Sequence, residues 1–296
     1  YPSSVVMNGV PAKLAGVKRI VIITPSNNGK IRSEILATAK LLGIKEIYRI
    51  GGAQAIAAMT FGTESIPKVD KIFGPGNQYV TEAKQYSMNF GISIDMPAGP
   101  SELLILADNS ANPKYVAADL LSQAEHGIDS QVVLVSNSKN LIDQVSKELN
   151  IQKNSLSRLK IINKSLENSK SIFFKSIDDA IEFINEYAPE HYIINVENEE
   201  YCISNLSSAG SVFIGNYTPE SAGDYASGTN HTLPTNGYAK QYSGVNTDSF
   251  FKTITFQKIS KRGLNSISSA IQTMALSEGL DAHKQAVSIR TNDDEN

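Results

Sequence analysis

The sequence predicts an α/β fold with two incomplete, doubly wound, Rossmann-like units and a C-terminal helical arm. Three observations lead to this prediction. Short β-branched runs alternate with helical patterns, the order expected of a parallel sheet. The alternation pauses at Pro97-Ala98-Gly99-Pro100 and then restarts. It ends near residue 246, after which only helical patterns follow. The predicted domains are therefore 1–97, 98–245 and 246–296.

The first unit opens with a β-branched segment at 17–23, closed by Thr24-Pro25-Ser26. Such a segment is typical of a buried parallel strand. A helix at 31–42 follows, and Gly43 is suited to its C-terminal cap. The remaining predicted elements are strands at 46–50, 71–73 and 92–95 and helices at 53–59 and 78–86.

The second unit repeats the alternation. Its predicted strands lie at 102–107, 131–135, 171–175, 191–195 and 211–214, and its helices at 113–124, 141–149 and 177–187. Residues 215–250 are rich in Gly, Asn, Thr, Ser and Tyr, and so long a loop in a compact protein is usually functional. In the arm, 266–277 and 281–289 are predicted helices, and 293–296 a solvated tail.

Composition narrows the class of protein. The net charge is −3, which argues against a nucleic-acid groove with its basic face. No apolar run approaches a membrane span, and the first residues do not read as a secretory signal. The single cysteine, Cys202, excludes an internal disulfide and reads as a small buried apolar residue. We therefore expect a cytoplasmic enzyme without nucleic-acid or membrane partners.

The chain has four histidines, and each stands near a carboxylate or a carboxamide. This pairing indicates one site assembled from distant segments, because imidazole serves as a base near neutral pH and as a metal ligand. The four motifs are Gln123-Ala124-Glu125-His126, Glu190-His191, Asn230-His231 with Asp224 upstream, and Glu278 followed by His283.

Each motif also has a purely structural interpretation. Gln123 and His126 are spaced to share one face of a helix and one metal, but a histidine at a helix C-terminus is stabilising by itself. Glu190-His191 is either an acid/base pair or a surface Glu beside a partly buried His. Asp224 alone reads as a turn former. Glu278 and His283 alone read as a helix end and a solvated face.

Two glycine turns stand between a strand and a helix. Gly74-Pro75-Gly76 opens a helix whose N-terminus is suited to a phosphate. Tyr79 occupies the position of the third glycine in a dinucleotide fingerprint, so a structural turn is the alternative. Gly51-Gly52 has the same context and the same alternative.

Eight segments, in this order, resemble the histidinol dehydrogenase family over nearly the whole chain. They are GGAQAIAA at 51–58, KIFGPGN at 71–77, DMPAGPSE at 95–102, DLLSQAEHG at 119–127, APEH at 188–191, AGDY at 222–225, GTNHTLPT at 228–235 and EGLDAH at 278–283.

The resemblance implies a zinc- and NAD-dependent homodimer that oxidises L-histidinol through L-histidinaldehyde to L-histidine, the last steps of histidine biosynthesis. It implies zinc ligation by Gln123, His126, Asp224 and His283, acid/base catalysis by Glu190 and His191, and NAD contacts from Gln54 and Asn77. The implied substrate contacts are Ser101, His231 and Glu278, together with Gln123, His126, His191, Asp224 and His283. Glu278 and His283 would come from the partner subunit, which makes the active site a shared one.

Two alternative functions stay open at this point. One is a truncated, non-catalytic protein that binds zinc and histidinol; the other is a related dehydrogenase of a different amino alcohol. Family members carry a region ahead of the position matching Tyr1, which supplies part of one α/β domain and a tyrosine near the nucleotide. Retention of both Glu190 and His191 favours an active enzyme.

Overall fold

The computed structural model describes residues 1–292. Residue contacts divide the chain into two compact units, one of Tyr1–Phe251 and one that begins at Lys252. The solvated tail predicted at 293–296 lies outside the described residues.

The larger unit contains a five-stranded parallel sheet in the order β7-β6-β5-β8-β9. This is the strand order of a doubly wound fold, in which the chain begins at the centre of the sheet and reverses direction once. The predicted α/β class is thereby confirmed. The strands are β5 (Glu102–Ala107), β6 (Gln131–Ser136), β7 (Lys170–Phe173), β8 (His191–Asn195) and β9 (Ser211–Ile214).

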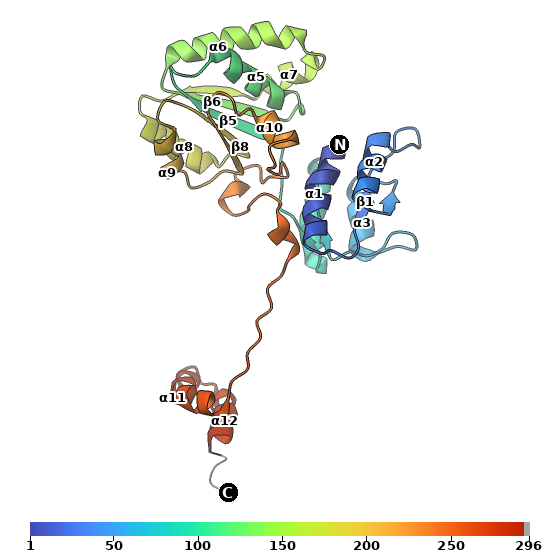
Figure 1. The fold of residues 1–296 in the computed structure, drawn as a ribbon, viewed down its shortest axis with the longest axis vertical. Helices are drawn as coiled ribbons and strands as arrows, with labels where there is room; N and C mark the ends of the chain where they lie inside the picture. Colours follow the sequence, from blue (N-terminus) through green and yellow to red (C-terminus); the bar gives the residue numbers. More distant parts are fainter. Residues whose placement is uncertain (293–296) are drawn as a thin grey trace. The chain divides into compact units, whose positions relative to one another are not determined.

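Helices cover both faces of this sheet (Figure 1). On one side Leu103 and Ile105 of β5 pack with α5 (Pro113–Ala124), α6 (Lys139–Gln152) and α7 (Leu159–Glu167). On the other side Leu104 and Leu106 pack with α8 (Ile177–Tyr187) and α9 (Glu199–Ser204). Because both faces of β5 are buried, the strand is apolar at nearly every position. The short 3₁₀ helix η2 (Lys153–Ser155) follows α6.

The strands of the N-terminal part pair as two separate two-stranded parallel sheets. One joins β1 (Val21–Ile23) to β2 (Glu46–Tyr48), and the other joins β3 (Lys71–Ile72) to β4 (Ser93–Ile94). β1 starts later than predicted because exposed Lys18 and Arg19 occupy the first half of that segment. The helices there are α1 (Pro2–Leu14), α2 (Ser33–Leu41), α3 (Ala53–Phe61), α4 (Gln78–Ser87) and the 3₁₀ helix η1 (Met88–Phe90).

Four helices of residues 1–292 were not predicted: α1, α7, α9 and α10 (Glu220–Tyr225). α10 is six residues long and carries Gly223 in its interior, so it lacks a helical pattern that a sequence can show. It lies within the segment predicted as the long loop at 215–250, together with the 3₁₀ helices η3 (Tyr238–Lys240) and η4 (Thr247–Phe250).

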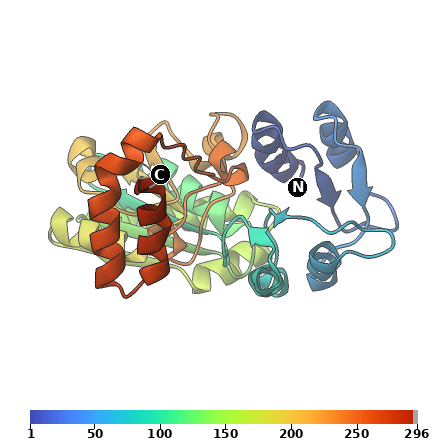
Figure 2. The ribbon, with the colours of Figure 1, turned by 90° about the horizontal axis from the view of Figure 1, so that it is seen from below.

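The second unit is a helical hairpin of α11 (Lys261–Ser277) and α12 (Asp281–Thr291), which lie side by side in Figure 2. The predicted C-terminal helices are thus confirmed, and Ser260 caps α11 earlier than expected. Gly279, with φ +70°, makes the turn between them. Within residues 1–292, no helix combines the length and apolarity that a membrane crossing requires.

Candidate active site

The polar side chains of the candidate site gather at the amino ends of β5 and β8. Glu102 begins β5, His191 begins β8, and Glu190 precedes it directly. In open α/β sheets the usual ligand crevice lies at the carboxyl ends of the strands, so this site is at the opposite edge. The linker at 95–101 explains the placement, because it runs from the carboxyl end of β4 to the amino end of β5.

His191 is buried among three carboxylates. Its Nδ1 atom lies 3.6 Å from Glu190 Oε2 and 3.8 Å from Glu220 Oε1, and its Nε2 atom lies 3.8 Å from Asp224 Oδ1. Glu190 is itself held by the backbone amide of Glu102, which donates to Oε2 at 2.9 Å. The adjacent residues Glu190 and His191 therefore meet in one cluster, because Glu190 stands just outside the strand where side chains need not alternate.

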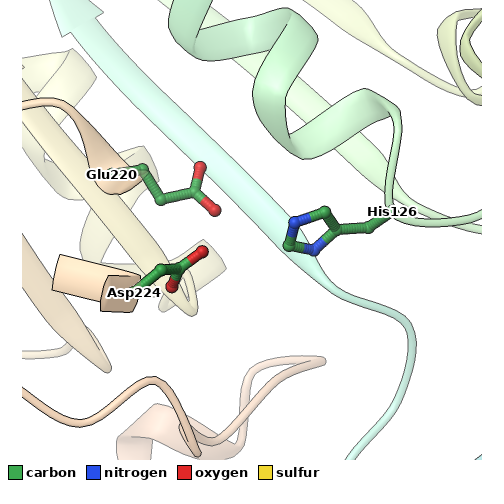
Figure 3. A group of neighbouring side chains, drawn as sticks. All are labelled: His126, Glu220 and Asp224. Carbon is green, nitrogen blue, oxygen red and sulfur yellow. The ribbon is translucent and has the colours of Figure 1, made fainter. Parts of the chain in front are cut away.

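A second cluster, of three side chains that could hold a metal ion, adjoins His191. One nitrogen of His126 and one carboxylate oxygen each from Glu220 and Asp224 lie within 4.8 Å of one another (Figure 3). Glu220 and Asp224 are four residues apart on α10, so they share one helix face. The prediction that His126 lies on the same helix as Gln123 was wrong: α5 ends at Ala124, and exposed His126 stands in the following turn.

Sequence reasoning missed Glu220, which is 1% exposed. The spacing of Glu220 and Asp224 is the signal that could have identified it, once the segment was recognised as a helix. Burial, partly opposed by His191 and reinforced by Asp224 and Glu190, raises the pKa of Glu220 to about 8.

The two histidines beside Asp224 have opposite pKa shifts. Burial alone would lower the pKa of His191, but Glu190, Glu220 and Asp224 outweigh it and raise the pKa to about 10. Burial lowers the pKa of His231, against the attraction of Asp224, whose Oδ1 lies 3.8 Å from His231 Nδ1. His231 is therefore the neutral imidazole of the pair.

Other predicted residues lie on the same or neighbouring segments. Ser101 precedes β5, and its carbonyl accepts a hydrogen bond from Gln131 N at 3.2 Å. Asn77 is the N-cap of α4, where its side chain accepts from Val80 N. Gln54 is exposed in the first turn of α3, and α3 packs against α4. The two predicted NAD contacts thus stand at the starts of two packed helices.

Glu278 and His283 lie in the second unit, at the end of α11 and in the first turn of α12. Both side chains are exposed. With Ile271, Met274 and Leu280 they line a pocket of about 390 Å³ between the two helices. A carboxylate and an imidazole thus stand together at the edge of an apolar hollow.

Comparison with known proteins gives the family. The model of the histidinol dehydrogenase family matches residues 1–291. Histidinol dehydrogenase from Bacteroides thetaiotaomicron is 58% identical over 291 residues, which are 98% of this chain and 68% of that protein. The chain belongs to the histidinol dehydrogenase family.

Two further relatives support membership of this family. The chloroplastic histidinol dehydrogenase of Arabidopsis thaliana is 53% identical over 296 residues, covering 99% of this chain and 64% of its own length. The crystal structure of histidinol dehydrogenase from Elizabethkingia anophelis superposes with a TM-score of 0.96 at 57% identity, over 99% of this chain and 68% of that one. The predicted family and its oxidoreductase class are confirmed.

The cluster of buried side chains fits a metal ion. Gln123 is fully buried, and neither its Oε1 nor its Nε2 has a hydrogen-bond partner among the described residues. Such an unpaired carboxamide is costly unless something else binds it. The buried carboxylates Glu190, Glu220 and Asp224 also concentrate negative charge around a single imidazole. A cation near His126 would offset the negative charge and could bind the Gln123 carboxamide. Imidazole and carboxylate groups are zinc ligands.

Hydrogen bonding indicates that a further carboxyl group, Glu102, carries a proton. Tyr187 Oη lies 2.9 Å from Glu102 Oε2 and 2.7 Å from Gln131 Oε1, yet a phenol has one hydrogen to donate. Gln131 Nε2 donates to Asn168 O at 3.0 Å, which leaves Oε1 facing Tyr187. Both contacts are satisfied when protonated Glu102 donates to Tyr187 and Tyr187 donates to Gln131.

Burial raises the pKa of Glu102 to about 7, so this carboxyl group holds a proton more readily than an ordinary one, although hydrogen bonds that Tyr187 and Asn236 donate to the ionised form oppose the shift. The network matters for the site because Glu102 Oε1 accepts from Asn236 N at 2.6 Å. Glu102, at the start of β5, therefore binds two segments at once: its side chain binds Asn236, and its backbone amide binds Glu190.

Replacement of Glu102 by Gln is expected to preserve this network, because an amide can donate to Tyr187 and accept from Asn236. Glu102→Ala should leave buried polar groups unpaired and lower the free energy of unfolding by about 1–3 kcal/mol. The raised pKa stabilises the wild type fully below pH 4.5, and this stabilisation is lost as pH rises through about 7. The melting temperature should therefore fall less between pH 5 and pH 8 for Glu102→Gln than for the wild type. Equal declines would mean that Glu102 is ionised at both pH values.

Proposed function

We propose that this chain oxidises L-histidinol to L-histidine through L-histidinaldehyde, with zinc bound in the cluster and NAD as the acceptor of two hydrides in turn. The observation that carries the proposal is the buried Glu190–His191 pair beside the group His126, Glu220 and Asp224. It combines a proton acceptor with a place for a cation at one edge of the sheet. Membership of the histidinol dehydrogenase family supports the choice of substrate.

In the first oxidation the neutral form of His191 takes the hydroxyl proton of the alcohol as a hydride leaves the carbinol carbon. A cation bound by Asp224 would offset the negative charge that raises the pKa of His191 and so favour this neutral form. The surrounding carboxylates stabilise the imidazolium that forms, and Glu190, held by the amide of Glu102, keeps the ring in place. His191 Nδ1 faces Glu102 O and Glu190, whereas Nε2 is buried without a hydrogen-bond partner among the described residues, so we assign the proton transfer to Nε2. General-base help of this kind contributes roughly 10²–10⁴-fold to a rate.

The second oxidation begins with water. Glu190 takes a proton from a water molecule as its oxygen attacks the aldehyde carbon, and it then gives this proton to the former carbonyl oxygen, which completes the hydrate. His191, after losing its proton to solvent, accepts a hydroxyl proton of the resulting hydrate. A second hydride leaves that carbon, and the carboxylic acid of histidine forms. Each oxidation releases one hydride and one proton from the reacting group, and the added water supplies the second oxygen.

Gln123, His126 and Asp224 would hold the zinc from this chain, with His283 as the fourth ligand. Glu220 lies in the same group and would either bind the ion directly or hold the charge beside it. When bound, zinc supplies affinity for the imidazole and amine nitrogens of histidinol and so orients the substrate. The substrate contacts that remain, Ser101, His231 and Glu278, follow the family motifs on which they stand.

The chain acts as a homodimer with a shared active site in this proposal. The helical hairpin buries few of its apolar side chains: Ile267, Met274, Leu276 and Ile289 are all exposed. A surface of this kind is suited to a partner. Exchange of identical segments across a two-fold axis would bring Glu278 and His283 to the partner's site.

The proposed reaction is tested by following NADH formation from L-histidinol with zinc-loaded protein. We expect two NADH for each L-histidine formed. L-Histidinol binding without any NADH would instead indicate a non-catalytic binding protein, and faster turnover of another amino alcohol would change the substrate. Either outcome contradicts the proposal.

Removal of one metal ligand gives a more specific prediction. His126→Ala should weaken zinc binding by well over tenfold, because loss of even an outer partner of a metal site costs about 10–100-fold in affinity. Zinc content after gel filtration, measured by atomic absorption, should fall together with activity. The neighbouring substitution Glu125→Ala is the matched control and should retain zinc. Full zinc occupancy in the His126 variant would show that the cluster does not hold the metal.

A further inference from the structure

A buried ion pair lies behind the glycine turn that joins β3 to α4. Lys84 Nζ is 2.5 Å from Asp95 Oδ1, and the two side chains are only 5% and 2% exposed. Burying two charges is expensive, and such a pair persists only where the geometry satisfies both partners. The reaction described above makes no use of this pair.

Both members of the pair bind the backbone of Gly74. Lys84 Nζ donates to Gly74 O at 2.8 Å, and Asp95 Oδ2 accepts from Gly74 N at 2.8 Å. Gly74 has φ +115°, a conformation that other residues rarely adopt. The ion pair therefore holds the first residue of the turn by its amide and its carbonyl at once.

These contacts also define which amides a phosphate can reach. The N–H of Gly74 is already engaged by Asp95, and Pro75 has none. The first amide groups that remain are those of Gly76 and Asn77. A Cβ at Gly76 would lie 2.3 Å from Val80 Cγ1, so the turn is packed tightly onto its own helix. A phosphate at this turn would therefore meet the amide groups of Gly76 and Asn77 and not that of Gly74.

Asp95 connects this turn to the linker that leads into β5. Its Oδ1 atom accepts from Met96 N at 2.7 Å, at the start of the linker at 95–101. At the other end of the linker, Gly99 N donates to Thr235 Oγ1, and Glu102 accepts from Asn236 N. The linker is therefore fastened both to the glycine turn and to the segment beside the acid/base pair.

We propose that Lys84 and Asp95 are positioning residues that fix the turn at 74–77 relative to the amino end of β5. A nucleotide bound at the turn would then present its nicotinamide to the carbinol carbon of the substrate. This inference rests on the proposed NAD-dependent function. Neither residue touches the reacting atoms. Their effect is geometric, and a misplacement of about 1 Å costs roughly 10²-fold in rate.

The test compares Lys84→Met with Ile162→Ala, a change at a buried core residue of α7 that lowers stability away from the turn. Lys84→Met should lower kcat/KM for NAD by roughly 10–100-fold, whereas KM for histidinol stays within about twofold of the wild type. The core variant should show no such selective loss. Lys164→Met breaks an exposed ion pair with Glu167 and is the control for the substitution itself.

Two further variants keep the test decisive. If Lys84→Met does not fold, the double variant Lys84→Met/Asp95→Asn removes both charges and avoids an unpaired buried one. Lys84→Arg retains the charge and should restore part of the NAD affinity. NAD binding is measured by calorimetry as well as by kinetics.

Asn77→Ser separates this inference from the proposed NAD site, because serine keeps the helix cap but lacks the amide group. If Asn77→Ser and the Lys84 variant both weaken NAD binding, the positioning role is supported. If Asn77→Ser weakens NAD binding and the Lys84 variant lowers neither NAD binding nor kcat/KM for NAD, the positioning role is wrong. If neither does, NAD binds elsewhere and the proposed site fails together with this inference.

Discussion

Replacement of His191 by Asn is expected to slow oxidation of L-histidinol by roughly 10²–10⁴-fold, the contribution of a general base. Asparagine retains a polar group of similar size but cannot accept a proton near neutral pH. The zinc content should be unchanged, because Gln123, His126 and Asp224 are intact. Steady-state rates with each of L-histidinol and L-histidinaldehyde, together with metal analysis, check this result.

The two half-reactions distinguish His191 from its neighbour. Glu190→Gln should slow aldehyde oxidation more than alcohol oxidation, since only the second step needs an activated water. The hydrogen bond from Glu102 N can still be made by the amide oxygen, so the position of the side chain is retained. Equal losses in both half-reactions would contradict the separate role of Glu190.

Mixed dimers of two inactive variants should regain activity. His283→Ala removes the proposed partner-derived ligand, and His191→Asn removes the proposed base. In a heterodimer one site receives an intact His191 from one chain and an intact His283 from the other, while the second site carries both defects. About half of the heterodimer sites should therefore work, a limit set by two-fold symmetry. Co-expression with two different affinity tags isolates the heterodimer for assay.

The control is the mixed dimer of His191→Asn with Glu190→Gln, whose defects lie in the same unit of the chain. Each of its sites then keeps one defect, so recovery is not expected. Restored activity in the first heterodimer alone supports a shared site. A verified His283/His191 heterodimer without activity would place both residues in one chain's site.

The sequence by itself determined the α/β class, the places of most strands and helices, and the family. Strand β5 shows why: a strand buried on both faces must be apolar at nearly every position, and that run is visible without coordinates. Long amphipathic helices such as α8 are equally visible, because their period is local. Rare motifs such as the one at 119–127 carry the family resemblance, and they too are local.

The tertiary structure alone decided what surrounds each reactive group. Glu220 reaches His191 from a short helix without a periodic pattern, and Glu102 is recognised as a protonated acid only through Tyr187 and Gln131. Lys84 and Asp95 are ordinary surface residue types that become a buried pair through packing. Burial and charge around a side chain depend on segments far apart in the chain, so a sequence pattern can propose reactive residues but cannot assign their partners.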